Sequence, residues 1–179
     1  MKETQRSRTA EAAAAVRAAH LLHDRPVILA DPFAIRLTSH TWRLICRSAL
    51  LHWLVVRKLL SPLRPVHGQI LGRARYAEEK LEEAVRQGVS QYVILGAGLD
   101  SFALRRADLS STLRIYEVDH AATQRSKRNR LTDLCLPVPD NLEFVPVDLE
   151  HGSLRDALAA STYSLYAKGS FHGSERCRI

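Results

Sequence analysis

The sequence contains little cysteine and nothing that resembles an export signal. Its three cysteines, Cys46, Cys135 and Cys177, lie far apart and form no CxxC pair or Cys/His cluster. This spacing argues against a disulfide framework and against a zinc site, so we predict no metal. Free thiols are typical of a reducing compartment. Because the first ten residues are also polar, we expect a cytoplasmic protein with no secretory signal.

The chain also lacks a long hydrophobic run that is free of charge. Residues 42–60 are the most hydrophobic stretch, but basic residues interrupt them at Arg43, Arg47, Arg57 and Lys58. Charges at mid-bilayer are costly, so a membrane span is excluded. Apolar residues recur at helical spacing, which predicts one packed amphipathic helix; they are Trp42, Ile45, Ala49, Trp53, Val56 and Leu60. A helix that lies on a membrane surface is the less favoured alternative.

Acidic residues are scarce in the N-terminal third, and this produces the net charge of +7. Residues 1–60 hold ten Lys/Arg and four Asp/Glu, whereas residues 61–179 hold sixteen and fifteen. A surface that attracts anionic substrates or membranes is one interpretation. Scattered, solvated arginines are the interpretation that we favour. Because aromatic and basic residues do not interleave, we predict no nucleic-acid binding.

The remaining residues, with 46% apolar and 25% charged side chains, fit an ordinary folded chain of 179 residues. Helix formers predict a helix over 9–23, with Thr9 as its N-cap and Arg17 facing solvent. Asp31 is expected to cap a short helix that begins at Pro32. A further helix is predicted over 76–87, ended by Gly88.

The periodicity then changes to short apolar runs. Strands are predicted over 91–95, 113–118 and 143–147, with helices over 122–134 and 153–160. Alternating strands and helices predict an α/β fold with a parallel sheet and right-handed connections. From about Ser161 the chain shows little apolar patterning, so the sequence is expected to stop within the fold.

Each predicted strand ends in residues suited to a ligand. Gly96 and Gly98 follow the first strand, where glycine permits sharp turns and close approach. Ser101 replaces the third glycine of the dinucleotide fingerprint, which argues against NAD. Asp119 ends the second strand, 21 residues beyond Gly98, the interval expected for a carboxylate that binds a ribose diol. A cap on the next helix is the alternative role of Asp119.

The third strand ends in Asp148 and Leu149. The carboxylate of Asp148 is able to accept a hydrogen bond from an adenine amino group, and Leu149 to pack on the purine. A simple turn is the alternative for Asp148. His120 is expected to start a helix and is not assigned a catalytic role.

Taken together, these motifs resemble those of a known protein family. The segments QYVILGAGLDSFALR, IYEVDHAATQRSKRNRL and FVPVDLE resemble the leucine carboxyl methyltransferase-like family, in particular its bacterial group of S-adenosyl-L-methionine-dependent methyltransferases. The resemblance covers about residues 7–160. It implies a class I methyltransferase fold, a Rossmann-like parallel sheet with an N-terminal helical extension. The domains implied are an extension over 1–75, a partial cofactor-binding core over 76–160 and an irregular tail over 161–179, with the C-terminal half of the sheet missing.

The family's pattern also implies how the cofactor is held. Arg73 would bind the methionine carboxylate, Gly96 would back the methionine part, and Asp119 would bind the ribose. Asp148 and Leu149 would frame the adenine. Without the resemblance, Arg73 would be read as a surface arginine beside Arg75. No catalytic residue is implied.

The implied function is methyl transfer from S-adenosyl-L-methionine to an oxygen of a small molecule, with a carboxylate among the candidates. A truncated, catalytically inactive remnant, or a partner-binding fragment of such an enzyme, is the alternative. Neither the methyl acceptor nor the oligomeric state is predicted.

Overall fold

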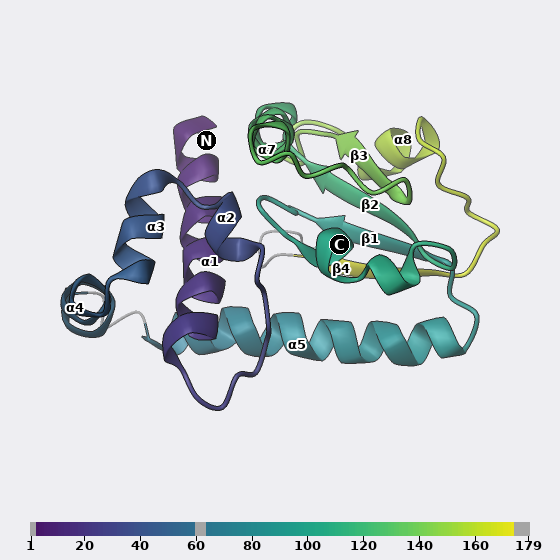
Figure 1. The fold of residues 1–179 in the computed structure, drawn as a ribbon. Helices are drawn as coiled ribbons and strands as arrows, with labels where there is room; N and C mark the ends of the chain where they lie inside the picture. Colours follow the sequence, from purple (N-terminus) through teal and green to yellow (C-terminus); the bar gives the residue numbers. More distant parts are fainter. Residues whose placement is uncertain (1–2, 60–63, 174–179) are drawn as a thin grey trace. The chain divides into compact units, whose positions relative to one another are not determined.

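The computed structural model describes residues 3–59 and 64–173, in two compact units (Figure 1). The helical unit comprises Met1–Glu79 together with the short segment Leu99–Ser101. The sheet unit comprises Lys80–Gly98 and Phe102–Ile179. An α/β architecture with N-terminal helices is therefore confirmed, while the predicted domain limits at residues 75 and 160 stay predictions.

The helical unit is built around the alanine-rich helix α1 (Glu3–His23). Its other elements are α2 (Ala34–Leu37), α3 (His40–Arg47), α4 (Ala49–His52), the π-helical segment η1 (Trp53–Leu59) and the first part of α5 (Arg64–Arg86). Small side chains let the helices approach closely, and the core consists of Ala15, Ala18, Ala19, Ala34 and Cys46.

Two predictions for the first helix are wrong. The helix begins at Glu3, so Thr9 lies inside it and is not the N-cap. Arg17 does not face solvent, because it is only 8% exposed. Its guanidinium is neutralised inside the unit by Asp31, whose carboxylate also accepts the N–H groups of Phe33 and Ala34. The short helix expected to begin at Pro32 instead begins at Ala34, and Phe33 occupies its N-cap position.

The prediction of a single helix over 42–60 is also wrong. Ser48 is extended, with ψ of 116°, and separates α3 from α4. Its hydroxyl accepts the N–H of Leu51 at 3.3 Å, which starts the second helix. Trp53, expected to be packed, is 47% exposed, and Leu60 lies outside the described residues. No helix in the described part of the chain is long and apolar enough to cross a membrane.

The sheet unit contains four parallel strands. In the order β3-β2-β1-β4, these are β3 (Leu142–Pro146), β2 (Arg114–Asp119), β1 (Gln91–Leu95) and β4 (Gly169–Gly173). The first three along the chain confirm the predicted strands. The connecting helices are α6 (Phe102–Arg105), the 3-10 turn η3 (Ala107–Leu109), α7 (Ala121–Asp133) and α8 (Leu154–Ala159).

The sheet is covered on both faces, as its parallel strands require. Leu158 of α8 packs against one face, whose buried side chains are Val93, Leu95, Tyr116, Val118 and Val145. Because side chains alternate along a strand, Glu117 and Phe144 point to the other face, where Lys127 of α7 meets both. The two helices therefore lie on opposite faces.

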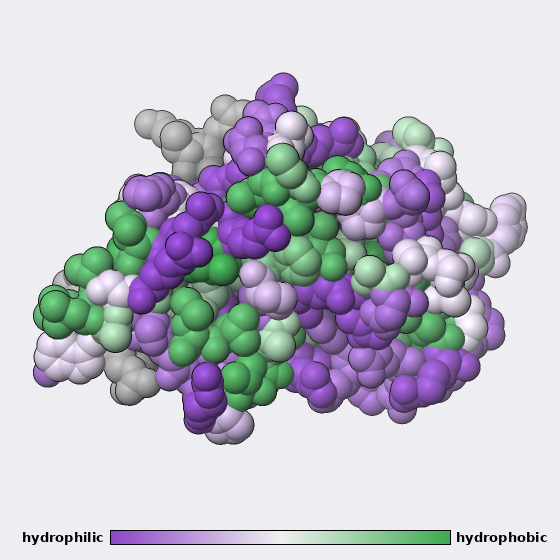
Figure 2. All heavy atoms as spheres, viewed as in Figure 1, coloured by the Kyte–Doolittle hydropathy of each residue, from purple (hydrophilic) through white to green (hydrophobic). Residues whose placement is uncertain are grey.

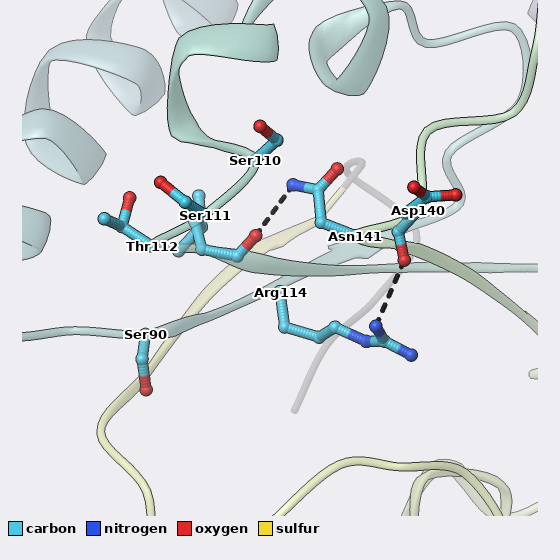
Figure 3. A pocket seen from close by; sticks show the side chains of 8 residues that line it. Ser90, Ser110, Ser111, Thr112, Arg114, Asp140 and Asn141 are labelled. Carbon is cyan, nitrogen blue, oxygen red and sulfur yellow. Dashed lines mark hydrogen bonds between the residues drawn. The ribbon is translucent and has the colours of Figure 1, made fainter.

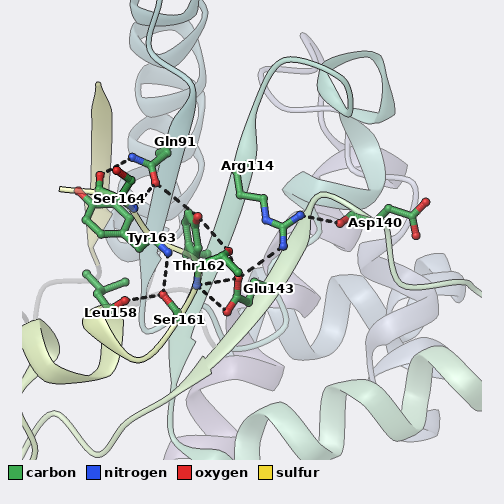
Figure 4. A network of polar contacts seen from close by, with 10 residues as sticks. Gln91, Arg114, Asp140, Glu143, Leu158, Ser161, Thr162, Tyr163 and Ser164 are labelled. Atoms are coloured by element: carbon green, nitrogen blue, oxygen red, sulfur yellow. Dashed lines mark hydrogen bonds and ion pairs between the residues drawn. The ribbon is translucent and has the colours of Figure 1, made fainter. Parts of the chain in front are cut away.

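β4 is a strand that the sequence pattern did not predict. Its approach is held by polar contacts rather than by an apolar run (Figure 4). The side-chain amide of Gln91 donates to the carbonyl of Ser164 and accepts its N–H, both at 2.8 Å. The carboxylate of Glu143 accepts the N–H of Thr162 at 3.2 Å and also its hydroxyl. Tertiary contacts, and not local apolar periodicity, thus place this segment beside β1.

Candidate functional site

The candidate site lies where β1, β2 and β3 end. The three strands are neighbours and parallel, with Leu95 opposite Val118 and Asp119 opposite Pro146. The N–H of Val147 also donates to the carbonyl of Asp119 at 2.9 Å, just beyond the end of β3. The carboxyl ends of all three strands therefore share one edge of the sheet, the edge at which open α/β sheets bind ligands.

The loop after β1 requires its two glycines. Gly96 has a φ of 65° and Gly98 a φ of 55°, a left-handed conformation that other residues adopt at a cost. The N–H of Gly96 donates to the carbonyl of Val118 at 2.7 Å. The glycines thus let the chain turn sharply across the end of β2.

Asp119 fastens this loop to the neighbouring strand end. Its Oδ2 accepts the N–H of Gly98 at 2.6 Å, and its Oδ1 accepts the N–H of His120 at 2.6 Å. A carboxylate has about four lone-pair sites, so each oxygen retains room for a second hydrogen bond. The cap of α7 is His120 itself, whose Nδ1 accepts the N–H of Ala122 at 3.2 Å.

The side chain of Asp148 forms its contacts within the turn after β3. Its Oδ1 accepts the N–H of Glu150 at 3.1 Å, and its Oδ2 lies 3.2 Å from Nδ1 of His151. The side chain of Leu149 is 37% exposed. Asp148 is thus a turn residue, and contacts of Asp148 and Leu149 with adenine stay predictions. Ligand atoms of Asp148, Glu150 and His151 lie within 4.8 Å of one another, but on exposed surface, which does not by itself indicate a metal.

Arg73 lies in the part of α5 that belongs to the helical unit, and its side chain is exposed. The Gly96, Gly98, Asp119 and Asp148 positions belong to the sheet unit. The binding of a methionine carboxylate by Arg73 therefore stays a prediction.

A buried ion pair behind the site was missed by the sequence interpretation. Glu117 and Lys127 are each 1% exposed, and Oε2 of Glu117 lies 2.5 Å from Nζ of Lys127. From the same helix, Nε2 of Gln124 donates to the carbonyls of Glu117 and Val145, at 2.8 and 3.0 Å. The Gln124–Lys127 spacing on one helix face was the available signal. The ion pair and Gln124 together fasten α7 to β2 and β3, the strands that precede Asp119 and Asp148 at the candidate site.

A second missed network lies in the helical unit. Nε of Arg17 donates to Oδ2 of Asp31 at 2.8 Å, and its NH2 group donates to the carbonyl of Leu99 at 2.8 Å. Ser101 donates to the same Asp31 oxygen at 2.6 Å. Ser101 stands where a dinucleotide fingerprint has glycine, and its hydroxyl is used as a buried donor.

A hollow of about 390 Å³ lies at the opposite edge of the sheet (Figure 3). Ser90, Leu113 and Asn141, the residues that precede β1, β2 and β3, line it together with hydroxyl groups of residues 110–112. Because it lies at the amino ends of the strands, this hollow is not the predicted cofactor site. The geometry at the carboxyl ends, and not this hollow, therefore indicates the candidate site.

The comparison with protein families shows which family the chain belongs to. The family model described as leucine carboxyl methyltransferase matches residues 10–171, which includes every element from most of α1 into β4. The chain belongs to this family. Family membership implies a Rossmann-like methyltransferase fold for the parallel sheet, and the match also extends into the segment after Ser161, where the sequence interpretation found no pattern.

Individual relatives carry the same description. A Bacillus subtilis (strain 168) protein, "Putative S-adenosyl-L-methionine-dependent methyltransferase YktD", is 50% identical over 78 residues, which are 44% of this chain and 26% of that protein. Proteins named "Putative S-adenosyl-L-methionine-dependent methyltransferase" from Mycobacterium avium (strain 104) and Mycobacteroides abscessus are 31% and 32% identical over 79% of this chain. The chain spans 45% and 46% of these two relatives, less than half of their length.

Proposed function

We propose that the sheet unit binds S-adenosyl-L-methionine and that the protein transfers its methyl group to an oxygen of a small molecule. The observation that carries this proposal is the hydrogen bonding of the Asp119 carboxylate. The N–H groups of Gly98 and His120 each donate to one of its two carboxylate oxygens at the shared strand edge, and each oxygen keeps acceptor capacity. A ribose diol offers two hydroxyl donors to such a carboxylate, in charge-assisted bonds.

The neighbouring groups fit the same ligand. The loop at Gly96 and Gly98 carries no side chain where the backbone turns, which permits a ligand to approach the main chain. Asp148 and Leu149 follow the adjacent strand end and are proposed to frame the adenine. Arg73 is proposed to bind the methionine carboxylate, because a guanidinium matches a carboxylate in a bidentate pair.

Methyl transfer requires little of the protein beyond positioning the two reactants. When bound, the cofactor supplies an electrophilic methyl group on a positively charged sulfur. In such a transfer the acceptor oxygen would form the new bond to the methyl carbon, and the electrons of the broken C–S bond would stay on sulfur as a neutral thioether. The chain's own residues orient the two reactants and exclude water, which is the main source of rate in such reactions. We assign no catalytic base.

Calorimetry with S-adenosyl-L-methionine and with its demethylated product tests the binding proposal. Asp119→Ala is expected to weaken binding about 10- to 100-fold, because charged hydrogen bonds contribute about 1.5–3 kcal/mol each. Asp133→Ala is the matched control, since Asp133 is an exposed carboxylate at the end of α7. Absence of heat and of any thermal shift at millimolar ligand, or equal affinity of Asp119→Ala and the parent chain, would refute the proposal.

Methyl-labelled cofactor tests the transfer. Carboxylate acceptors yield methyl esters, which release labelled methanol in base, whereas ethers and methylated nitrogen atoms do not. Base-labile label in a product confirms a carboxylate acceptor. Binding without any transfer supports the second candidate, a cofactor-binding chain that has no catalytic activity of its own.

A further inference from the structure

Large apolar side chains are exposed on the segment that includes α3, α4 and η1. They are Leu44, Leu50, Leu51, Trp53 and Leu54, here called the 44–54 surface. Leu50 is 66% exposed and Trp53 47%. In Figure 2, hydrophobic surface gathers at the left edge, where Figure 1 draws α3 and α4. Gathered apolar side chains of this size on a folded surface mark an interaction site.

Along the chain, basic residues surround the 44–54 surface and acidic ones are absent from the same stretch. No Asp or Glu occurs between Asp31 and Glu78, whereas eight Lys or Arg do. Arg47 and Lys58 are exposed within this stretch. Nζ of Lys58 lies 5.2 Å from the ring centroid of Trp53, so cationic and apolar groups are immediate neighbours. The partner must therefore present anionic groups beside an apolar phase.

An anionic lipid surface offers both. Basic side chains around leucine and tryptophan are the composition of helices that lie in the membrane interface. A single-stranded nucleic acid needs several aromatic platforms on which its bases can stack, whereas the 44–54 surface offers Trp53 as its one aromatic side chain. A second copy of the chain would set like charges against one another. The break at Ser48 also suits peripheral contact, because it divides the segment into short helices.

We propose that the 44–54 surface docks on an anionic membrane surface. Trp53 and the leucines enter the boundary between headgroups and acyl chains, while Arg47 and Lys58 contact lipid phosphates. This goes beyond methyl transfer, since it places the helical unit at a lipid interface whichever acceptor is methylated.

Co-sedimentation of the full chain with vesicles is the first test. We expect binding to phosphatidylcholine vesicles that contain about 30% phosphatidylglycerol, little binding to phosphatidylcholine alone, and a loss of binding in high salt. A chain that stays in the supernatant with the anionic vesicles overturns the proposal.

Tryptophan fluorescence reports the docking directly. Trp42 and Trp53 are the chain's two tryptophans, so Trp42→Phe leaves Trp53 as the only probe. Its emission should move to shorter wavelength with anionic vesicles and not with zwitterionic ones. A shift that depends on protein concentration without lipid would instead indicate a second copy, and a shift only with oligonucleotides would indicate nucleic acid. Either result overturns the proposal.

Matched variants distinguish binding through the 44–54 surface from nonspecific adsorption to the vesicles. Arg47→Gln and Lys58→Gln should each weaken vesicle binding about fivefold, the value of about one unit charge at an anionic surface. Leu50→Gln should weaken it about tenfold through lost apolar burial. The controls are Arg155→Gln and Leu165→Gln, exposed residues of the sheet unit. If the controls weaken binding as much as the variants, the docking assignment is wrong; circular dichroism confirms that each variant is folded.

Discussion

The buried pair of Glu117 and Lys127 provides a quantitative test of how the sheet unit is held together. Both side chains are 1% exposed, and 2.5 Å separates their charged atoms. Lys127→Met removes one charge and leaves the other without its principal partner in a site that water does not reach. Removal of one member of such a pair costs about 3–5 kcal/mol. Because domains are stable by only about 5–15 kcal/mol, this loss is a large share of the total.

The measurement has to report the sheet unit alone. Both tryptophans lie in the helical unit, so amide hydrogen exchange of residues 114–119 is the suitable probe, with urea titration by circular dichroism as a check. Glu117→Leu should be destabilising as well. The double variant should recover much of the loss, because apolar replacement of a whole buried pair is often neutral or stabilising.

An exposed pair serves as the control. Nζ of Lys80 lies 2.8 Å from Oε2 of Glu83 in the part of α5 that belongs to the sheet unit, yet the two side chains are 56% and 50% exposed. Glu83→Gln should leave the hydrogen exchange of residues 114–119 unchanged, because exposed ion pairs contribute little to stability. If Lys127→Met also costs less than about 1 kcal/mol, or if the double-variant cycle shows no coupling, the account of the buried pair is wrong.

Three further outcomes are expected. Burial raises the pKa of the Cys46 thiol from 9.0 to about 11. In a Cys177→Ser background, iodoacetamide at pH 8 should therefore label the exposed Cys135 and spare Cys46. The stability gained from the neutral Cys46 thiol is fully present below about pH 9 and is lost as the pH rises through about 11. Arg17→Met should lower the stability of the helical unit by about 3 kcal/mol in tryptophan-detected urea unfolding, because a buried carboxylate loses its ion pair. Gln91→Leu should speed hydrogen exchange of residues 162–173 by at least tenfold, since three hydrogen bonds that join its side chain to Ser164 and Ala167 disappear; unchanged exchange would contradict that role.

The elements that could be predicted are those whose cause is local. β1 is a run of five residues that are all buried, so apolar content alone marks it. Gly88 has a φ of 87°, a conformation that favours glycine at the end of a helix. Ser153 accepts the N–H of Asp156 at 3.2 Å, as its spacing before α8 predicts.

The elements that could not be predicted depend on distant partners. From its residue type alone, Arg17 is expected to face solvent. Its burial depends on the ion pair with Asp31, fourteen residues away. The approach of β4 depends on Gln91 and Glu143, which lie 73 and 19 residues before their partners. The helix expected over 42–60 ends at Ser48, because that hydroxyl accepts an N–H of the following turn and competes with a continuous helix.

For the candidate site, the order of residues along the chain predicted the chemistry: glycines that permit close approach, and a carboxylate at the interval expected for ribose binding. Only the tertiary structure decided that Asp119 accepts the N–H of Gly98, because hydrogen bonds across a parallel strand pair depend on register, which sequence spacing does not encode. The burial of Glu117 with Lys127 was decided in the same way. A charged side chain is buried stably only where an oppositely charged partner from another element lies within contact distance.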